Sequence, residues 1–194
     1  MRSAIAVPLN GTKMNGTSGE INVRRLTDAG DVGFPRVCDW FYTWFGKRDG
    51  RTPEMIAEIV GRSLNVGTRL PQTFVAYAGE TPVGVYQLSM ADDLASRPDV
   101  YPWLANVYVD ESRRKRGVCR AMLETVRENA ARAGLDELYL YTELEGLYER
   151  FGWRFVGSVN TFRAESPLER LYKLTIVPTP VVHSLGQIAE KRLV

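Results

Sequence analysis

Side chains that commonly bind metals or form disulfides are scarce in this sequence. Its 194 residues include one histidine, His183, and two cysteines, Cys38 and Cys119, which stand far apart. Neither the spacing of a zinc site nor a disulfide framework can be assembled from these residues. A Ser-His-Asp triad would depend on a histidine in the last part of the chain. We therefore expect no bound metal, and no hydrolase chemistry that needs such a triad.

Long apolar runs and a strong charge imbalance are absent as well. No stretch approaches the roughly 18 apolar residues of a membrane span, and the opening segment MRSAIAVPLNGTKMNG has too short an apolar run for a signal peptide. The formal net charge is +2, which gives little general attraction to nucleic acid or to a membrane surface. We expect a cytoplasmic protein whose partners include no nucleic acid and no membrane.

The composition that remains is that of one globular domain, with 44% hydrophobic and 25% charged residues. Residues 1–20 are rich in Gly, Thr, Asn and Ser and show little periodicity, which predicts a flexible leader. Strand-like and helix-like patterns fill residues 21–177, and a short polar segment follows. We expect a single domain over 21–177 and a C-terminal tail over 178–194.

Hydrophobic periodicity and turn signals divide this domain into strands and helices. Strands are expected at 21–23, 72–77, 82–89, 103–109, 138–141, 154–159 and 171–176. Helices are expected at 37–45, 53–64, 118–133 and 145–150. The second helix has a clear start, because Thr52 is a good N-cap and Pro53 suits the first helical position.

The residues before the third helix favour an anion site. An apolar strand that ends at Val109 leads into a basic turn that contains a glycine. The turn contributes Arg114, Lys115, Arg116 and Gly117. The first N–H groups of a helix have no intrahelical acceptor and lie at the positive end of its dipole. Since Gly117 leaves room for close approach to the backbone, we expect a pyrophosphate here. The alternative is a basic helix start that is simply solvated.

This segment resembles the acyl-CoA loop of the GNAT N-acetyltransferase superfamily. The family pattern is Arg or Gln, two residues, Gly, one residue and then Gly or Ala, and Arg114–Cys119 (RKRGVC) follows it at every position but the last. The preceding Val107–Val109 resembles the family's bulged fourth strand, and Leu147–Trp153 (LYERFGW) resembles its tyrosine-containing segment. These parts follow one another in the family's order, and the resemblance covers about residues 21–177.

The resemblance implies an α/β (α+β) fold with a mixed, mostly antiparallel, twisted sheet of about six to seven strands and helices on both faces. It implies an N-acetyltransferase that moves the acetyl group of acetyl-CoA to a primary amine by direct attack in a ternary complex, without a metal. The acceptor could be a small molecule or a protein or peptide amine. The residues expected to bind acetyl-CoA come from the fourth strand, the loop, the helix start and the end of the fifth strand. They are Val107, Tyr108, Val109, Arg114, Lys115, Arg116, Gly117, Val118, Cys119 and Thr142.

Proton transfer is assigned to one candidate acid and to a group of candidate bases. Tyr148 takes the place in which the family holds a tyrosine beside the cofactor sulfur, so the resemblance makes it the general acid. The apolar helical spacing of its segment leaves an ordinary core residue as the alternative. Asp93 and Asp99, with Asp92 beside them, precede the fourth strand and face the acceptor in the resembled fold. They are candidate bases acting through water, or else ordinary turn and capping residues.

Backbone and aromatic groups supply two further expectations. If a bulge leaves the N–H groups of Val107–Val109 unpaired, they could hold the acetyl carbonyl and its developing oxyanion. The alternative is a plain core strand with a complete ladder. The aromatic residues within 37–45 either pack as core or form a wall of the acceptor pocket, and the two roles can coexist.

Cys119 departs from the family pattern, which has a small residue there. Its side chain could crowd the pyrophosphate, or turn inward as a small hydrophobe, and a thiol at a helix N-terminus could have a lowered pKa. Thr142 is expected to replace an asparagine that is common in the family. These departures leave a non-catalytic acyl-CoA-binding sensor as the alternative function. The protein could be a monomer or a homodimer that pairs through a sheet edge.

Overall fold

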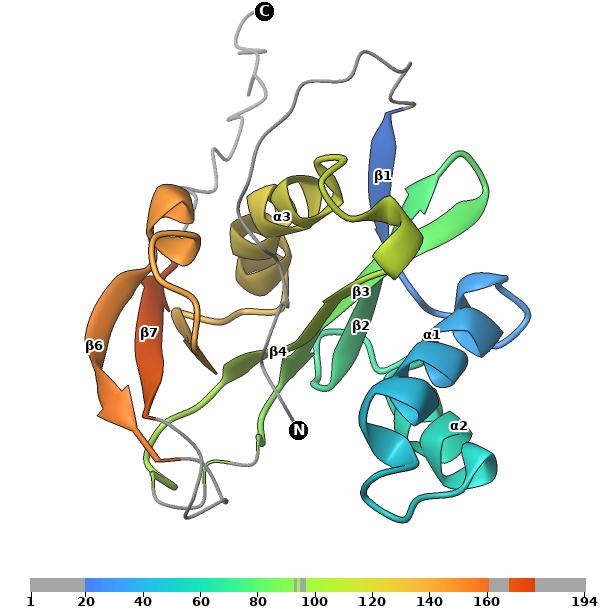
Figure 1. Cartoon of the computed structure of the whole chain (residues 1–194), viewed down its shortest axis with the longest axis horizontal. Helices are drawn as coiled ribbons and strands as arrows, with labels where there is room; N and C mark the ends of the chain where they lie inside the picture. The colour runs from blue at the N-terminus through green and yellow to red at the C-terminus, as the bar shows by residue number, and fades with distance from the viewer. Residues whose placement is uncertain (1–19, 93, 95–96, 161–167, 177–194) are drawn as a thin grey trace, which may run out of the picture.

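The computed structural model describes residues 20–92, 94, 97–160 and 168–176 (Figure 1). Nearly all of the expected leader and the whole expected tail lie outside these residues, as do Asp93 and His183. The described chain forms one sheet with strand order β1-β2-β3-β4-β5-β7-β6. Its strands are β1 (Ile21–Arg25), β2 (Gln72–Ala78), β3 (Thr81–Ser89), β4 (Trp103–Val109), β5 (Glu137–Thr142), β6 (Arg154–Val159) and β7 (Glu169–Thr175).

Helical segments connect these strands. The α-helices are α1 (Gly33–Phe41), α2 (Pro53–Gly61) and α3 (Val118–Arg132). A π-helical turn, η1 (Tyr42–Gly46), continues α1, and two 3₁₀ turns are η2 (Glu111–Arg113) and η3 (Tyr148–Phe151). No helix within the described ranges is long and apolar enough to cross a membrane.

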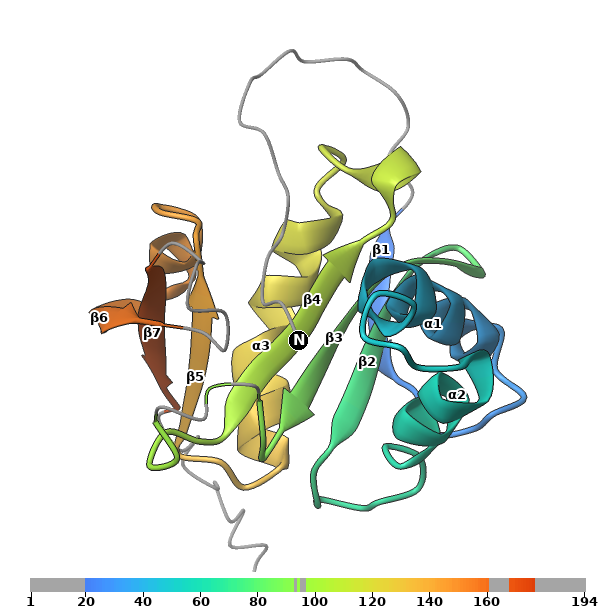
Figure 2. The same cartoon turned by 60° about the horizontal axis from the view of Figure 1, so that its bottom comes forward.

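The sheet is mixed and mostly antiparallel, and the predicted fold class is confirmed. Neighbouring strands run antiparallel except β4 and β5, which are parallel. The helix α3 covers one face, while α1 and α2 cover the other (Figure 2). Under α3, Met122 shares a buried cluster with Leu104 of β4 and Leu140 of β5. On the opposite face, Phe41 of α1 packs in a second cluster with Val85 of β3. These two apolar layers fix the sheet between the helices.

The first helix starts earlier than the aromatic pattern predicts. The Asp31 carboxylate accepts the Gly33 N–H at 2.7 Å and the Tyr77 hydroxyl at 2.6 Å. These bonds anchor the helix start on β2, four residues before the predicted start at Val37. The available signal was the Asp-x-Gly spacing of an Asx turn before the helix, which the aromatic periodicity did not include.

The expected helix at 145–150 is a single 3₁₀ turn instead. Gly146 and Gly152 have φ values of 76° and 83°, in the left-handed region. They bracket η3 and leave room for one turn between them. By contrast α3 fits its prediction, since it ends at Arg132 and Gly134 follows with φ 75°. The Thr52 hydroxyl accepts the Met55 N–H at 3.3 Å, as expected for the start of α2.

Candidate active site

The fourth strand carries a bulge beside the segment expected to bind acetyl-CoA. The register between β3 and β4 shifts between Val85 and Gln87, so that Asn106 and Val107 lie opposite a single residue of β3. Asn106 has a φ of 52°, a left-handed conformation that asparagine tolerates better than most residues. Such an insertion bends a strand and breaks its ladder locally. The strand that resembled a bulged strand is therefore bulged.

Beyond the bulge, β4 turns one backbone edge toward a gap. Within the described residues β4 pairs with β5 at one register position, Trp103 with Tyr139, and the two strands then diverge (Figure 2). On its other side, the Asp110 N–H bonds to a carbonyl of β3 at 3.0 Å. Because N–H directions alternate along a strand, the N–H groups of Val107 and Val109 point away from β3, into the gap.

The helix start at the end of this gap has the features of an anion site. Gly117 is the N-cap of α3 with φ 84°, and no described atom lies within 4 Å of the place a Cβ would take. Lys115 and Arg116 are exposed beside it, whereas the side chain of Val118 is buried and fixes the helix to the core. The start of α3 thus combines N–H groups that have no intrahelical acceptor with open space beside Gly117 and exposed positive charge.

The Arg114 side chain folds back from this loop. Its Nε donates to the Val109 carbonyl at 3.3 Å, and its Nη2 lies 3.2 Å from a Glu111 carboxylate oxygen. The guanidinium also lies 5.8 Å from the centroid of the Tyr108 ring. Arg114 thus supports the open edge of β4 in this state, and a direct phosphate contact by its side chain stays a prediction.

Tyr148 and Cys119 lie in the core under α3, close to the helix start. Tyr148 is fully buried, and its hydroxyl has no hydrogen-bond partner among the described residues. Burial raises the pKa of this hydroxyl, and the nearby Cys119 adds to the shift. Burial also raises the pKa of the Cys119 thiol to about 11, so the lowered thiol pKa considered above is not found. Cys119 packs inward as a small hydrophobe, while the role of Tyr148 as an acid stays a prediction.

Thr142 lies at the end of β5 and is buried. Its hydroxyl oxygen accepts the Leu144 N–H at 3.1 Å and so closes the turn after the strand. A contact from Thr142 to acetyl-CoA is untested by this geometry and stays a prediction.

The candidate bases lie in different environments. Asp99 is an exposed turn residue paired with Arg97 at 2.8 Å, and this hydrogen bond lowers its pKa. Asp92 accepts the Tyr141 hydroxyl at 3.0 Å, and burial raises its pKa to about 6. Asp93 lies outside the described residues. Of the two described aspartates, Asp92 has the pKa closer to neutrality.

A groove of about 720 Å³ lies between α1 and the end of β4. It is lined by Arg36, Asp39, Trp40, Thr43, Trp44, Val107, Tyr108, Val109, Asp110, Glu111, Ser112 and Arg114. Three of these residues form an aromatic wall, because the Tyr108 ring centroid lies 5.6 Å from that of Trp40 and 5.4 Å from that of Trp44. The aromatic residues of α1 and η1 thus serve both as core and as groove wall.

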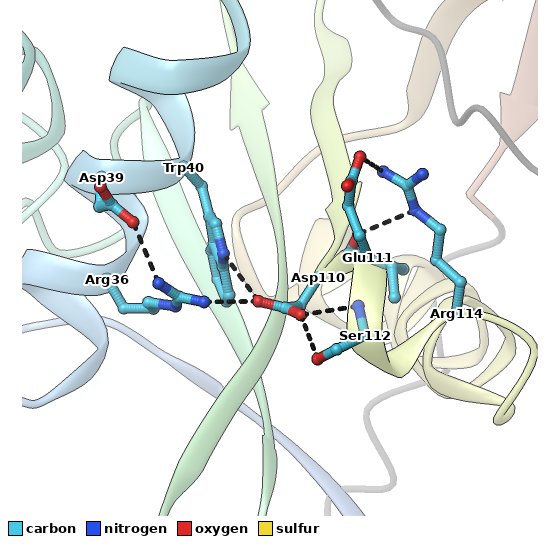
Figure 3. A network of polar contacts seen from close by, with 8 residues as sticks. Arg36, Asp39, Trp40, Asp110, Glu111, Ser112 and Arg114 are labelled. Carbon is cyan, nitrogen blue, oxygen red and sulfur yellow. Dashed lines mark hydrogen bonds and ion pairs between the residues drawn. The ribbon is translucent and has the colours of Figure 1, made fainter.

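Asp110 ties α1 to the end of β4, and our sequence reasoning missed it (Figure 3). Its carboxylate accepts Arg36 Nη2 at 2.6 Å and Trp40 Nε1 at 3.2 Å. It also accepts the backbone N–H and the hydroxyl of Ser112, at 3.0 and 2.6 Å. Burial opposes its ionisation, but the bonds from Ser112 and Arg36 outweigh that effect and lower its pKa. The Asp-x-Ser spacing was the available signal for the Ser112 bonds.

Metal-binding groups are not gathered anywhere in the described ranges: no cluster of three or more His, Cys, Asp or Glu side chains is found there. The groups assembled around the gap and the groove are backbone N–H groups, a glycine loop, a buried tyrosine and carboxylates.

Comparison with known proteins agrees with this arrangement. Residues 69–155, which include the bulged strand, the glycine loop and η3, match the model of the acetyltransferase (GNAT) domain family. No curated protein matches the chain.

Solved structures share the fold over most of the chain. An aminoglycoside 6'-N-acetyltransferase complexed with coenzyme A has a TM-score of 0.62 at 16% identity, over 82% of this chain and 99% of that one. The aminoglycoside 6'-N-acetyltransferase from Enterococcus faecium gives 0.61 at 16% identity, over 82% and 99%. A protein described as histone acetyltransferase HPA2 and related acetyltransferase, from Corynebacterium glutamicum, gives 0.59 at 21% identity, over 83% and 99%. Residues 69–155 thus match the acetyltransferase (GNAT) domain family, and the solved structures share its fold over most of the chain.

Proposed function

We propose that this chain transfers the acetyl group of acetyl-CoA to a primary amine by direct attack in a ternary complex. The observation that carries this proposal is the open edge of β4, which runs from the bulge toward the start of α3 and also borders the groove beside α1. An extended thioester chain can pair its amides with such an edge. A ligand on one side of β4 and an acceptor in the groove would then meet at the same strand.

The residues at the helix start fit the phosphates of acetyl-CoA. Gly117 leaves its backbone open to close approach, and Lys115 and Arg116 supply exposed positive charge. The inward packing of Cys119 supports binding, because the thiol that replaces the family's small residue is directed to the core. The bound thioester would supply an activated acetyl group.

Residues of this protein must then accept a proton from the ammonium group and donate a proton to the leaving thiolate. An ammonium with a pKa of about 10.4 must lose a proton, at a cost of roughly 4.6 kcal/mol at pH 7. We assign this proton to Asp92 through water, in preference to Asp99, because the carboxylate with the higher pKa is the better base. The neighbouring Asp93 remains a candidate.

The bond changes balance with these assignments. The amine nitrogen forms a bond to the acetyl carbon while the carbon–sulfur bond breaks, and Tyr148 gives its proton to the departing thiolate. The nitrogen then releases its second proton, which restores the Tyr148 hydroxyl through solvent. The N–H groups of Val107 and Val109 would stabilise the negative charge that develops on the carbonyl oxygen. The hydroxyl of Tyr148 is without a partner in the described chain, which supports its role as the donor.

The groove favours a cationic acceptor. Trp44 and Tyr108 offer aromatic faces. The groove lining also has one more carboxylate than guanidinium, with Asp39, Asp110 and Glu111 against Arg36 and Arg114. The names of the structural neighbours suggest two acceptor classes to compare, aminoglycosides and histone-like peptide amines. The two free cysteines suit a reducing compartment, so we place the enzyme in the cytoplasm.

Thermal unfolding with and without acetyl-CoA, followed by thiol release across aminoglycosides, polyamines and lysine peptides, tests the proposal. Stabilisation by acetyl-CoA together with thiol release on one acceptor class would support it. Stabilisation without release on any amine would favour the non-catalytic acyl-CoA-binding module. Absence of any stabilisation would count against acetyl-CoA as a ligand.

A further inference from the structure

A continuous chain of side-chain hydrogen bonds crosses the sheet on the face that carries α1 and α2. Asn106 Nδ2 donates to Gln87 Oε1 at 2.6 Å, and Gln87 Nε2 donates to Thr73 Oγ1 at 2.8 Å. Thr73 Oγ1 donates to Ser63 Oγ at 2.7 Å, and Ser63 Oγ donates to the Val60 carbonyl at 2.6 Å. All donors point the same way, from β4 through β3 and β2 to the end of α2.

These four polar side chains are buried among apolar neighbours. Asn106 and Gln87 are 3% and 5% exposed, and Thr73 and Ser63 are fully buried. Burying polar groups is unfavourable unless each has a partner, and apolar residues could fill the same space. A network whose members are bonded in sequence strengthens itself and fixes one arrangement of its side chains. The presence of a polar network here, in place of apolar side chains, therefore indicates that the conformation of β4 at Asn106 is important.

The hydrogen-bond chain begins at Asn106, the residue that forms the bulge. Asn106 has the left-handed conformation there, and its side chain is held by Gln87 on the adjacent strand. Thr73 and Gln87 lie directly opposite each other in the β2–β3 register, and Gln87 lies opposite Ala105, the residue before the bulge. The links are thus between cross-strand neighbours, which leaves Asn106 little freedom to rotate.

We propose that Gln87, Thr73 and Ser63 are positioning residues for the acetyl-carbonyl site. By holding Asn106 at the bulge, they keep the N–H groups of Val107 and Val109 aimed into the gap between β4 and β5. The proposal rests on the proposed function, since it assigns those N–H groups to the acetyl oxygen. None of the four side chains in this hydrogen-bond network ionises at physiological pH. Loss of the network therefore changes the geometry of the site and leaves the pH dependence of the reaction unchanged.

The test uses Thr73→Val, a substitution of similar shape that removes two consecutive links. Thr73→Ser keeps the hydroxyl and is the conservative variant. The matched control is Thr125→Val on α3, where the Thr125 hydroxyl is 3.0 Å from the Tyr86 hydroxyl on the opposite face of the sheet. The control loses a hydroxyl contact of the same kind on the face away from Asn106, so Asn106 keeps its bond to Gln87.

Three measurements separate positioning from general stability. In the ligand-free protein, amide hydrogen exchange at Tyr108 and Asp110, whose N–H groups face β3 beside the bulge, should accelerate at least tenfold in Thr73→Val and stay near wild type in Thr125→Val. With acetyl-CoA labelled with ¹³C at the acetyl carbonyl, the shift of the bound signal should move back toward the free value in Thr73→Val. The value of kcat should fall about tenfold or more, with KM for acetyl-CoA within about threefold and an unchanged pH profile. Thr73→Ser should restore all three.

The outcomes are distinct. If wild type binds acetyl-CoA and turns over, but Thr73→Val matches Thr125→Val in exchange, carbonyl shift and kcat, the positioning proposal alone is wrong. If wild type does not bind acetyl-CoA, the proposed function is wrong and the positioning proposal falls with it. Should Thr73→Val not fold, Ser63→Ala removes only the last hydroxyl of the chain and is judged by the same measurements.

Discussion

Tyr148 is a fully buried side chain whose hydroxyl has no partner among the described residues. Leaving such a group unpaired is costly, so its presence favours a partner that arrives with the substrate. We expect Tyr148→Phe to lower kcat by roughly one to two orders of magnitude, because only the proton for the leaving thiolate is lost. Acetyl-CoA affinity should be unchanged. Thiol-release kinetics and calorimetry measure the two quantities.

Tyr172→Phe is the matched control for this substitution. The Tyr172 hydroxyl donates to Glu149 at 2.6 Å, so its removal should lower thermal stability while kcat stays near wild type. Tyr148→Phe should show the reverse, with lower kcat and no loss of stability. An unchanged kcat in Tyr148→Phe would retire Tyr148 as the acid.

Asp92 introduces a pH dependence that can be measured without an acceptor. Burial raises its pKa to about 6, above the value of about 3.9 in an unfolded chain. Its contribution to stability is therefore fully present below the unfolded pKa and is lost as pH rises through the folded pKa. Since Asp92→Asn cannot ionise, its melting temperature relative to wild type should rise between about pH 4 and pH 7. Thermal unfolding of both proteins over this range measures the difference.

Asp99→Asn provides the comparison for Asp92. The Arg97 hydrogen bond lowers the pKa of Asp99, so the contribution of this exposed pair is present above the unfolded pKa of about 3.9 and is lost only as pH falls through the folded pKa. If Asp92→Asn follows wild type in parallel at every pH, the raised pKa is wrong and the assignment of Asp92 as the base loses its support.

At the scale of single elements, the two ends of α3 make a matched pair. Gly117 and Gly134 both have positive φ, and no described atom lies within 4 Å of a Cβ added at either residue. Each substitution to Asp therefore meets similar backbone strain. Only Gly117→Asp places negative charge at the expected phosphate site, so it should weaken acetyl-CoA binding at least roughly tenfold. Calorimetric affinities that are equal for the two variants would contradict the loop assignment.

Asp110, which links α1 to the end of β4, should control how well the groove binds the amine acceptor. Asp110→Asn weakens the ion pair with Arg36 and alters the bonds to Ser112, so we expect a loss of roughly 1–3 kcal/mol in stability. The KM for the amine should rise, with little change in acetyl-CoA affinity. Asp39→Asn loses only an exposed pair with Arg36 and should cost about 0–1 kcal/mol. Denaturant unfolding and steady-state kinetics test both variants, and a KM that does not respond to Asp110→Asn would exclude this role.

The elements were predictable because each carries a local signal. The alternation of β4, the Thr52 cap and the glycines at the ends of α3 all lie within a few residues of the structure they specify. Asp110 and Asp92 were harder, because their environments depend on distant partners. Arg36 is 74 positions from Asp110, and Tyr141 is 49 positions from Asp92. A sequence alone does not reveal which distant side chains will meet, so the start of α3 after Gly117 was predicted and the carboxylate network was not.

At the scale of the whole molecule, the sheet has two parts, β1 to β4 and β5 to β7. The junction between these parts is formed mainly by side chains. Beyond the single register position of β4 with β5, Leu140 of β5 and Leu104 of β4 are joined through the core under α3. We expect Leu140→Val to weaken acetyl-CoA affinity several-fold at a stability cost of about 0.5–1.5 kcal/mol. Ile56→Val, in the core of the opposite face, should lose similar stability and keep its affinity. Calorimetry measures the acetyl-CoA affinity of both variants, and equal affinities for Leu140→Val and Ile56→Val would contradict the expectation.

The divergence of β4 from β5 frees the separation of these two strands from the backbone ladder. In an ordinary sheet the spacing of about 4.8 Å between strands is dictated by the backbone ladder, and no substitution can alter it. Here the ladder stops after one residue pair, so the separation depends on how much volume the core places beneath it. If acetyl-CoA binds along β4 as proposed, substitution of buried methyl groups would change the room for the acyl group while every residue that touches the ligand stays the same.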